Sequence, residues 1–488
     1  MVFDLLRTLY LVCVLVLALY ALGSGVLLIA YLARGRRPIT ASQIAPVDSP
    51  PLSDSTLPTM CVQLPIYNEP RVVTRLIDAA ACLEYPPGAL SIQVLDDSTD
   101  ETQALAAARV VYWHSQGVAI THLHRADRSG YKAGALAYGL RHTDAELIAV
   151  FDSDFVPPAG IVMSAAAELH ADPTVGMVQT RWSHLNAAAN PLTGALALAL
   201  DAHFVVEQSG RAQAGWLLNF NGSGGVWRRR AIEDAGGWRD TTLTEDLDLS
   251  YRAQFAGWRL AYRGDLSAPG EIPPTLSAYR QQQSRWALGG SQVCALLIGT
   301  LWRTPGLTLG ARLMATLHLA QYLVHALILL VILLTPILIA ANSLPDTDLS
   351  LLGFIGILPP LMMAVGQRAL YPDWRARLLR GLPVLIVVAT GMTWCNARAA
   401  LLGLVRRGGE FQRTPKMGDG VGTSEIIAPA NALPELAFCL YTAFGALLAW
   451  SRAPALVPYM ALYAVCFGIA TITLWFERRA ARQFARSM

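Results

Sequence analysis

The amino-acid sequence predicts an α/β domain inserted between helices that cross a membrane. Of its 488 residues, 53% are hydrophobic and only 15% are charged, whereas an average globular protein has about 25% charged residues. The apolar residues gather in long uncharged runs near both ends of the chain, and the region between them has ordinary polarity. We therefore expect a membrane protein with one large polar domain.

Charge and cysteine content exclude other classes of protein. The net charge of +3 is too small to indicate a nucleic-acid partner. The seven cysteines are scattered, with no Cys-x-x-Cys pair and no cysteine–histidine cluster. The sequence therefore indicates neither a zinc site nor a disulfide framework.

Five uncharged runs predict membrane-crossing helices, because a crossing helix needs about 20 apolar residues. The runs are 8–33, 313–345, 349–367, 436–451 and 453–476. The first is too long for a signal peptide, and no small-residue cleavage site follows it. The fourth is long enough if Glu435 lies among the lipid headgroups.

Arginine-rich loops predict the orientation of these helices, since such loops stay in the cytoplasm. Basic clusters follow the first, third and last runs, whereas Asp346 and Asp348 follow the second. If the shorter run 381–397 also crossed, the basic loops on its two sides would lie on opposite faces. We prefer five crossings, with the N-terminus outside and 381–404 at the cytoplasmic surface; a sixth crossing is the alternative.

The chain divides into four parts on this basis. Residues 1–37 form the N-terminal membrane helix, and the Pro/Ser-rich stretch 38–58 is a linker. Residues 59–300 form the α/β domain. Residues 301–488 form a second membrane domain, with an interfacial helix and a loop at 405–420.

Short apolar strands recur in the α/β domain, at 59–64, 91–95, 118–123 and 147–151. Alanine-rich helical stretches, such as 72–83 and 101–115, separate them. This alternation predicts a mostly parallel sheet. In such sheets, ligands bind at the carboxyl ends of the strands.

Polar clusters stand at three of these strand ends: Pro65, Tyr67 and Glu69, then Asp96 and Asp97, then Asp152 and Asp154. An Asp-x-Asp pair in this place suits Mg²⁺ or Mn²⁺, which can in turn hold a diphosphate. A single aspartate pair might equally cap a helix. Three clusters in strand register favour a binding site.

Lysine is rare in this chain, since only Lys132 and Lys416 accompany its many arginines. Lys132 lies in a glycine-punctuated stretch, 128–135, that is suited to approach a phosphate. The alternative for each lysine is a chance position in solvent.

Two downstream motifs complete the candidate set. Glu245 and Asp246 follow Thr244, which alone indicates an N-cap with an acidic first turn. Gln282, Arg285 and Trp286 stand at i, i+3 and i+4, hence on one helix face. That face is either a surface stripe near the bilayer, or a guanidinium for a phosphate with an indole for a sugar.

Taken in order, these motifs resemble the membrane-embedded, processive-type family 2 glycosyltransferases, above all the cellulose-synthase-like A and C proteins. That group includes mannan and glucomannan synthases. The resemblance runs from about residue 61 to residue 416 and includes the family-like segments 178–182, 201–204, 220–228 and 236–239.

The resemblance implies a GT-A-type nucleotide-sugar-binding domain and a role for each motif. The donor and its cofactor would be held by Pro65, Tyr67, Glu69, Asp96, Asp97, Lys132, Asp152, Asp154, Gln282, Arg285 and Trp286. Asp152 and Asp154 would bind Mg²⁺ or Mn²⁺, and Asp246 would be the general base. The acceptor would be bound by Gly222, Ser223, Glu245 and Trp286.

Two positions depart from the family pattern. Asn221 stands where cellulose synthases have cysteine, and Arg413 replaces the valine of the gating-loop pattern Phe-x-Val-Thr-x-Lys, here 411–416. The second departure leaves the role of this loop open.

The expected function is inverting transfer of a hexose from a nucleotide sugar, GDP-mannose or UDP-glucose, to a growing β-linked polysaccharide. The product would be of mannan, glucomannan or glucan type, and its synthesis would be coupled to translocation. Alternatives are a glycolipid-forming transferase acting on a lipid acceptor, and an inactive scaffold or channel subunit. We expect a multi-pass protein of the bacterial inner membrane with its catalytic domain in the cytoplasm, and no nucleic-acid partner.

Overall fold

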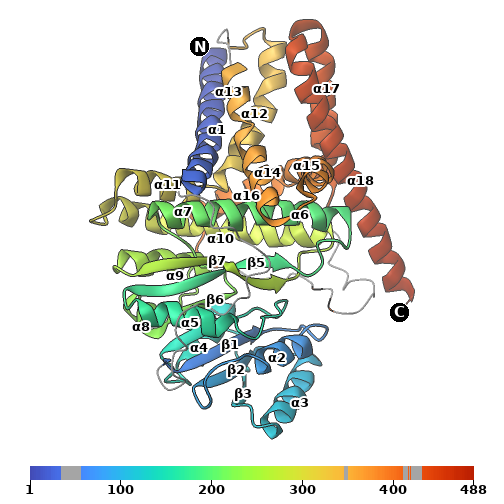
Figure 1. The fold of residues 1–488 in the computed structure, drawn as a ribbon. Helices are drawn as coiled ribbons and strands as arrows, with labels where there is room; N and C mark the ends of the chain where they lie inside the picture. The colour runs from blue at the N-terminus through green and yellow to red at the C-terminus, as the bar shows by residue number, and fades with distance from the viewer. Residues whose placement is uncertain (34–56, 346–349, 410–415, 417, 419–430, 488) are drawn as a thin grey trace.

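The computed structural model describes residues 1–33, 57–345, 350–409, 416, 418 and 431–487. A seven-stranded sheet lies at one end of the molecule and a bundle of long helices at the other, with a layer of helices between them (Figure 1). The predicted α/β class with a helical membrane domain is confirmed.

The sheet has the strand order β3-β2-β1-β4-β6-β5-β7. Its strands are β1 Met60–Ile66, β2 Leu90–Asp96, β3 Ile120–His124, β4 Leu147–Val150, β5 Val175–His184, β6 Gly225–Arg228 and β7 Arg259–Gly270. The first four pair in parallel, as the sequence predicts. β6 lies antiparallel between β4 and β5, so the sheet is mixed.

Helices cover both faces of the sheet. α2 Val73–Ala81, α3 Thr102–Ser115 and α5 Ile161–Ala171 pack on one face, and α4 Tyr131–Leu140, α8 Arg229–Asp234 and α9 Glu245–Phe255 on the other. Successive strand residues point to opposite faces. In β4, Leu147 and Ala149 accordingly join one core, while Ile148 and Val150 join the other.

A helical layer separates the sheet from the bundle (Figure 1). It contains α6 Pro191–Ala202, the π-helical turn His203–Gln208 and α7 Ser209–Ala214, which follow one another without a break. Beside them lie α10 Leu276–Arg303 and α11 Leu309–Leu319. α10 continues through residue 300, where the sequence analysis ends the α/β domain.

Among the described residues, five helices are long and apolar enough to cross a membrane: Val2–Ala33, Leu323–Ala340, Leu352–Leu370, Leu433–Arg452 and Pro454–Gln483. They comprise α1 Val2–Ala33, α12 Leu323–Ala340, α13 Ser350–Ile355 with α14 Leu358–Leu370, α17 Leu433–Arg452, and the 3₁₀ turn Pro454–Leu456 with α18 Val457–Ser487. Each coincides with a predicted run, although 313–319 belongs to α11. On α17, Leu440 and Leu447 are 63% and 76% exposed, as is typical of a lipid-facing surface.

The uncertain run 381–404 falls in a bent pair, α15 Trp374–Gly391 and α16 Thr393–Val405, which meet at 51°. α15 packs beside α6, α14 and α18, and α16 packs beside α10 and α12. Both lie at the end of the bundle nearest the sheet (Figure 1). This position favours an interfacial segment, and the number of crossings stays a prediction.

Candidate active site

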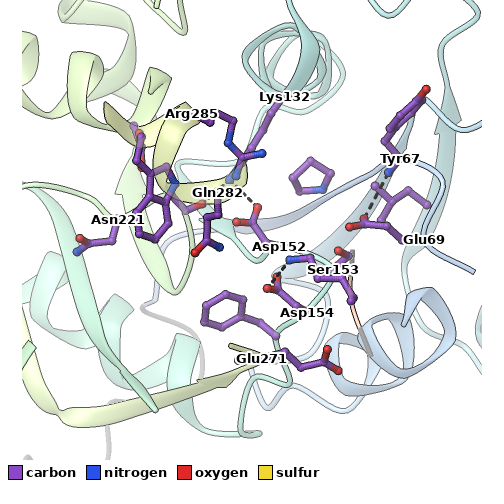
Figure 2. Close-up of a pocket in the computed structure, with 18 of the residues that line it drawn as sticks. Tyr67, Glu69, Lys132, Asp152, Ser153, Asp154, Asn221, Glu271, Gln282 and Arg285 are labelled. Carbon is purple, nitrogen blue, oxygen red and sulfur yellow. Dashed lines mark hydrogen bonds and ion pairs between the residues drawn. The ribbon is translucent and has the colours of Figure 1, made fainter. Parts of the chain in front are cut away.

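A cavity opens between the carboxyl ends of the strands and the helical layer. It brings together residues far apart in the sequence, from the ends of β1 and β4, the starts of α4 and α9, and the first turns of α10 (Figure 2). Of the predicted site residues, its wall contains Pro65, Tyr67, Glu69, Asp97, Lys132, Asp152, Asp154, Gly222, Glu245, Asp246, Gln282, Arg285 and Trp286.

Two predicted site residues do not reach the wall. Asp96 is fully buried. Its carboxylate accepts a hydrogen bond from Ser98 N at 2.8 Å and contacts His122 Nε2 at 2.8 Å. Ser223 lies behind Asp152, whose backbone N–H donates to Ser223 Oγ at 3.0 Å. Neither side chain lines the cavity, and both hold neighbouring residues of the site through hydrogen bonds.

The Asp-x-Asp pair follows β4 and faces two ammonium groups. Lys132 Nζ lies 2.5 Å from Asp152 Oδ1, and Lys416 Nζ pairs with Asp154 Oδ2. The chain's only two lysines thus pair with the two carboxylates. Lys132 and Asp152 are 20 residues apart in the sequence, and Lys416 and Asp154 are 262 residues apart. The rest of the gating pattern, 411–415, lies outside the described residues.

The chemistry of this pair suits a hard divalent cation. Asp154 Oδ1 is buried without a hydrogen-bond partner, so an acceptor oxygen is available in a water-poor place. No group of three or more histidine, cysteine or acidic side chains is arranged for a metal within the part of the chain that the structure describes. Two carboxylates suffice for Mg²⁺ when substrate phosphates complete its shell.

The acidic turn at the start of α9, Glu245 and Asp246, lines the same cavity. Burial, and then the charge of Glu245, raise the pKa of Asp246 to about 7. Burial also raises the pKa of Glu245. Thr244 stands at the N-cap position of α9 with Glu245 and Asp246 in the first turn, as the helix-cap alternative expects, but its side chain makes no capping bond.

Lys132 joins the two acidic groups. Its Nζ donates to Gly222 O at 2.7 Å and lies 3.8 Å from Glu245 Oε1. Burial opposes the charged form of Lys132, but Asp152 and Glu245 outweigh burial and raise its pKa. The ammonium therefore stays charged beside any phosphate in the cavity.

Position 222, between Asp246 and Lys132, favours glycine over every other residue type. Its φ is +86°, and a Cβ there would lie 3.0 Å from Asp246 Oδ2 and 3.4 Å from Lys132 Nζ. A side chain would therefore displace the carboxylate, in a backbone region that other residues avoid.

The cavity face of α10 carries Gln282, Arg285 and Trp286, as the helical spacing predicts. Burial lowers the pKa of Arg285, while Glu245 and Asp152 act in the opposite direction. Arg285 and Gln282 point toward Asp152 from this helix (Figure 2). A guanidinium and an ammonium therefore stand on one side of the cavity.

The other end of the cavity has an aromatic and basic wall. The Arg128 guanidinium stacks on the Tyr67 ring, with Cζ 3.4 Å from its centroid. Asp97 is held by Arg125, with Nε at 2.7 Å from Oδ1 and Nη2 at 2.5 Å from Oδ2. This wall is suited to a planar base and its ribose.

A second cavity continues from the acidic turn toward the helix bundle. It shares Trp182, Leu200, Asn221, Thr244, Asp246 and Trp286 with the first, and adds His203, Phe204, Asn219, Leu247, Gly290, His318, Gln321 and Tyr322. Its lining contains both aromatic rings and amide groups, a composition that suits sugar rings. Asp246 stands at the junction of the two cavities.

Sequence reasoning missed several wall residues. Glu271 lines the cavity just beyond β7, where Arg75 Nη2 lies 2.6 Å from Oε1 and Gly418 N donates to the same oxygen at 3.1 Å. Its position at a strand end is a usable signal, but β7 itself was not predicted. His203 contacts Glu207 at 2.6 Å and Asn221 at 3.1 Å, and only the family-like segment 201–204 pointed to it.

Comparison with known proteins identifies the family of the chain. Residues 61–232 match the family model "Glycosyl transferase family 2", and residues 147–366 match "Glycosyl transferase family group 2". Glucomannan 4-beta-mannosyltransferase 9 of Arabidopsis thaliana is 32% identical to this chain over 398 residues, which are 79% of this chain and 73% of that protein.

A second relative matches over a shorter segment, and a solved structure matches over most of the chain. Probable glucomannan 4-beta-mannosyltransferase 2 of rice is 40% identical over 251 residues, which are 51% of this chain and 43% of the rice protein. A solved mannosyltransferase of Pyrobaculum calidifontis, in complex with GDP-Man and Mn²⁺, has a TM-score of 0.49 and 21% identity, over 81% of this chain and 99% of that one. On the family models and the long Arabidopsis alignment, the chain belongs to glycosyltransferase family 2, alongside the glucomannan 4-beta-mannosyltransferases, and its α/β domain is of the GT-A type.

Proposed function

We propose that the chain transfers a hexose, with inversion, from a nucleotide sugar to a growing β-linked polysaccharide of mannan, glucomannan or glucan type. The observation that carries this proposal is the position of Asp246 at the junction of two cavities. One cavity has the charges that a nucleoside diphosphate requires, and the other has the aromatic and amide groups that a glycan requires.

Asp246 is the general base of the proposed reaction. As the acceptor hydroxyl oxygen forms its bond to the anomeric carbon, the hydroxyl proton passes to the Asp246 carboxylate. The bond from the anomeric carbon to the diphosphate breaks, and the diphosphate leaves with the electron pair. Attack from the face opposite the leaving group inverts the anomeric centre.

Lys132 and Arg285 stabilise the departing diphosphate. Both lie on the cavity wall with charges that the neighbouring carboxylates support, and cationic groups aimed at a developing charge contribute strongly in a water-poor site. Asp152 and Asp154 would hold Mg²⁺ or Mn²⁺, which supplies Lewis-acid neutralisation of the phosphate oxygens when bound. Trp286 offers its ring to the acceptor sugar.

The names of the relatives favour a mannosyl donor, GDP-mannose, over UDP-glucose. The second cavity extends to Tyr322, which directly precedes the apolar helix α12, so a product bound there would lie beside the bundle. The catalytic domain is assigned to the cytoplasmic side, and the bilayer is the expected surrounding of the apolar helices. A bacterial inner membrane gains no support, since the named relatives are from rice and Arabidopsis.

Release of nucleoside diphosphate by the purified full-length chain tests this function. With Mn²⁺ present, GDP-mannose, UDP-glucose and UDP-N-acetylglucosamine are offered separately, each with and without a short β-1,4-mannan acceptor. We expect acceptor-dependent release with GDP-mannose and a product that β-1,4-mannanase digests. A glycolipid product resistant to that enzyme would instead support transfer to a lipid.

A further inference from the structure

The first turn of α10 is bound by a carboxylate from the last helix of the chain. Glu477, on α18, accepts hydrogen bonds from Leu276 N at 2.7 Å, Ser277 N at 2.9 Å and Ser277 Oγ at 2.5 Å. Thr275 Oγ1 accepts from the next backbone group, Ala278 N, at 3.2 Å. Three of the N–H groups that a helix start leaves unpaired are thus satisfied.

A second contact follows one turn later. Arg280 on α10 lies 3.0 Å from Glu435 Oε1 on α17, and Glu435 is fully buried. The sequence analysis required Glu435 to lie at the level of the lipid headgroups if the fourth run crosses, and the structure adds that its carboxylate forms an ion pair within the protein. α17 and α18 pack against each other, so one helix pair supplies both carboxylates that hold the start of α10.

The held segment is also the wall of the donor cavity. Ile272 and Pro273 line the cavity immediately before α10, and Gln282 and Arg285 line it from the second and third turns. A rigid helix transmits a shift of its first turn to the residues that follow within two turns. The position of the Arg285 guanidinium therefore depends on what binds the helix start.

We propose that Glu477 is a positioning residue for the diphosphate-binding face of α10, so that α18 helps to hold the active site in place without lining it. The inference rests on the proposed function, in which this cavity binds a nucleoside diphosphate. Glu477 touches no substrate and acts through Arg285 and Gln282.

The charge and both oxygens of Glu477 matter for this role. A carboxylate at a helix N-terminus complements the positive end of the helix dipole, and its two oxygens accept the three hydrogen bonds. A glutamine has one acceptor oxygen, so its NH₂ group would face either the Leu276 N–H or the two donors of Ser277. Glu477→Gln therefore loosens the first turn while changing almost no volume.

The test is a double-mutant cycle on nucleotide binding, measured by calorimetry on full-length protein in detergent. GDP with Mn²⁺ is titrated into wild type, Glu477→Gln, Arg285→Ala and the double variant, and UDP is titrated in parallel. We expect Glu477→Gln to weaken GDP binding at least fivefold in the wild-type background and less than twofold in the Arg285→Ala background.

Matched variants separate positioning from folding. Glu477→Asp keeps the charge and both oxygens and should recover part of the lost affinity. Arg482→Gln changes an exposed residue near the same helix end and should bind GDP as wild type does. If Glu477→Gln does not yield folded protein, Ser277→Ala removes one of the three bonds and should weaken binding at least twofold.

Several results would overturn the inference. Equal GDP affinity of wild type and Glu477→Gln would do so, and so would equal losses in the two backgrounds, because Glu477 would then act independently of Arg285. A wild-type protein that binds neither GDP nor UDP would count against the proposed function itself.

Discussion

Replacing Asp246 by asparagine should remove most of the turnover and leave donor binding intact. The side chain keeps its size, whereas the proton acceptor and the negative charge are lost. General-base catalysis contributes about 10²–10⁴-fold, which corresponds to about 2.7–5.4 kcal/mol at about 1.36 kcal/mol per tenfold change in rate.

The pKa of Asp246 adds a second signature. A base must be deprotonated to act, and the pKa of this group is raised to about 7 rather than lowered. The acid limb of kcat/KM should therefore lie near pH 7, and activity should fall about tenfold for each unit below it. An unperturbed carboxyl would place that limb near pH 4.

The assay is release of nucleoside diphosphate with saturating acceptor, from about pH 5 to 9, together with calorimetric donor binding. Asp144→Asn, an exposed aspartate outside the cavity wall, is the control and should behave as wild type. If Asp246→Asn kept more than a tenth of the wild-type kcat, or kept the same acid limb, another group would be the base.

Three further outcomes are expected. Gly222→Ala should lower kcat at least tenfold with folding preserved, because its Cβ would lie 3.0 Å from Asp246 Oδ2 at a φ of +86°; full activity on nucleotide release would refute the close contact. Removing divalent ions with EDTA should abolish turnover, and Asp154→Asn should raise the Mn²⁺ concentration needed for half-maximal rate about tenfold or more; turnover unaffected by EDTA would contradict the cation site. In intact cells, a membrane-impermeant maleimide should label Ala455→Cys and not Arg407→Cys if the bent pair α15–α16 stays at the cytoplasmic face, and the reverse pattern would mean that it crosses.

Much of the fold was predictable because local patterns carry it. The uncharged runs predicted all five long apolar helices, and the spacing of short strands predicted the parallel half of the sheet. The antiparallel β6 was missed, because its four residues, Gly225–Arg228, are too short to show periodicity. The domain boundary at residue 300 was placed from the polarity of the sequence. α10 continues past this residue to Arg303, so the boundary falls inside a helix.

The candidate site followed from one geometric rule and one resemblance. Parallel strands end at one edge, so Tyr67, Asp97 and Asp152 could be expected in a common cavity, and they line it. Asp96 could have been excluded by the same geometry, because neighbouring strand residues point to opposite sides. The roles predicted for Asp96 and for the other site residues remain predictions that mutagenesis can test.

The sequence by itself determined the long apolar helices, the first four strands and the types of charged groups, because hydrophobic periodicity and motif spacing are properties of neighbouring residues. Only the tertiary structure decided that Lys416 meets Asp154 and that Glu477 binds the start of α10, across 262 and 200 residues respectively. Nothing near Glu477 in the sequence distinguishes it from an ordinary charge at the end of a membrane helix. Its partner is set by how α18 packs against the helical layer, and such packing depends on the shapes of whole elements.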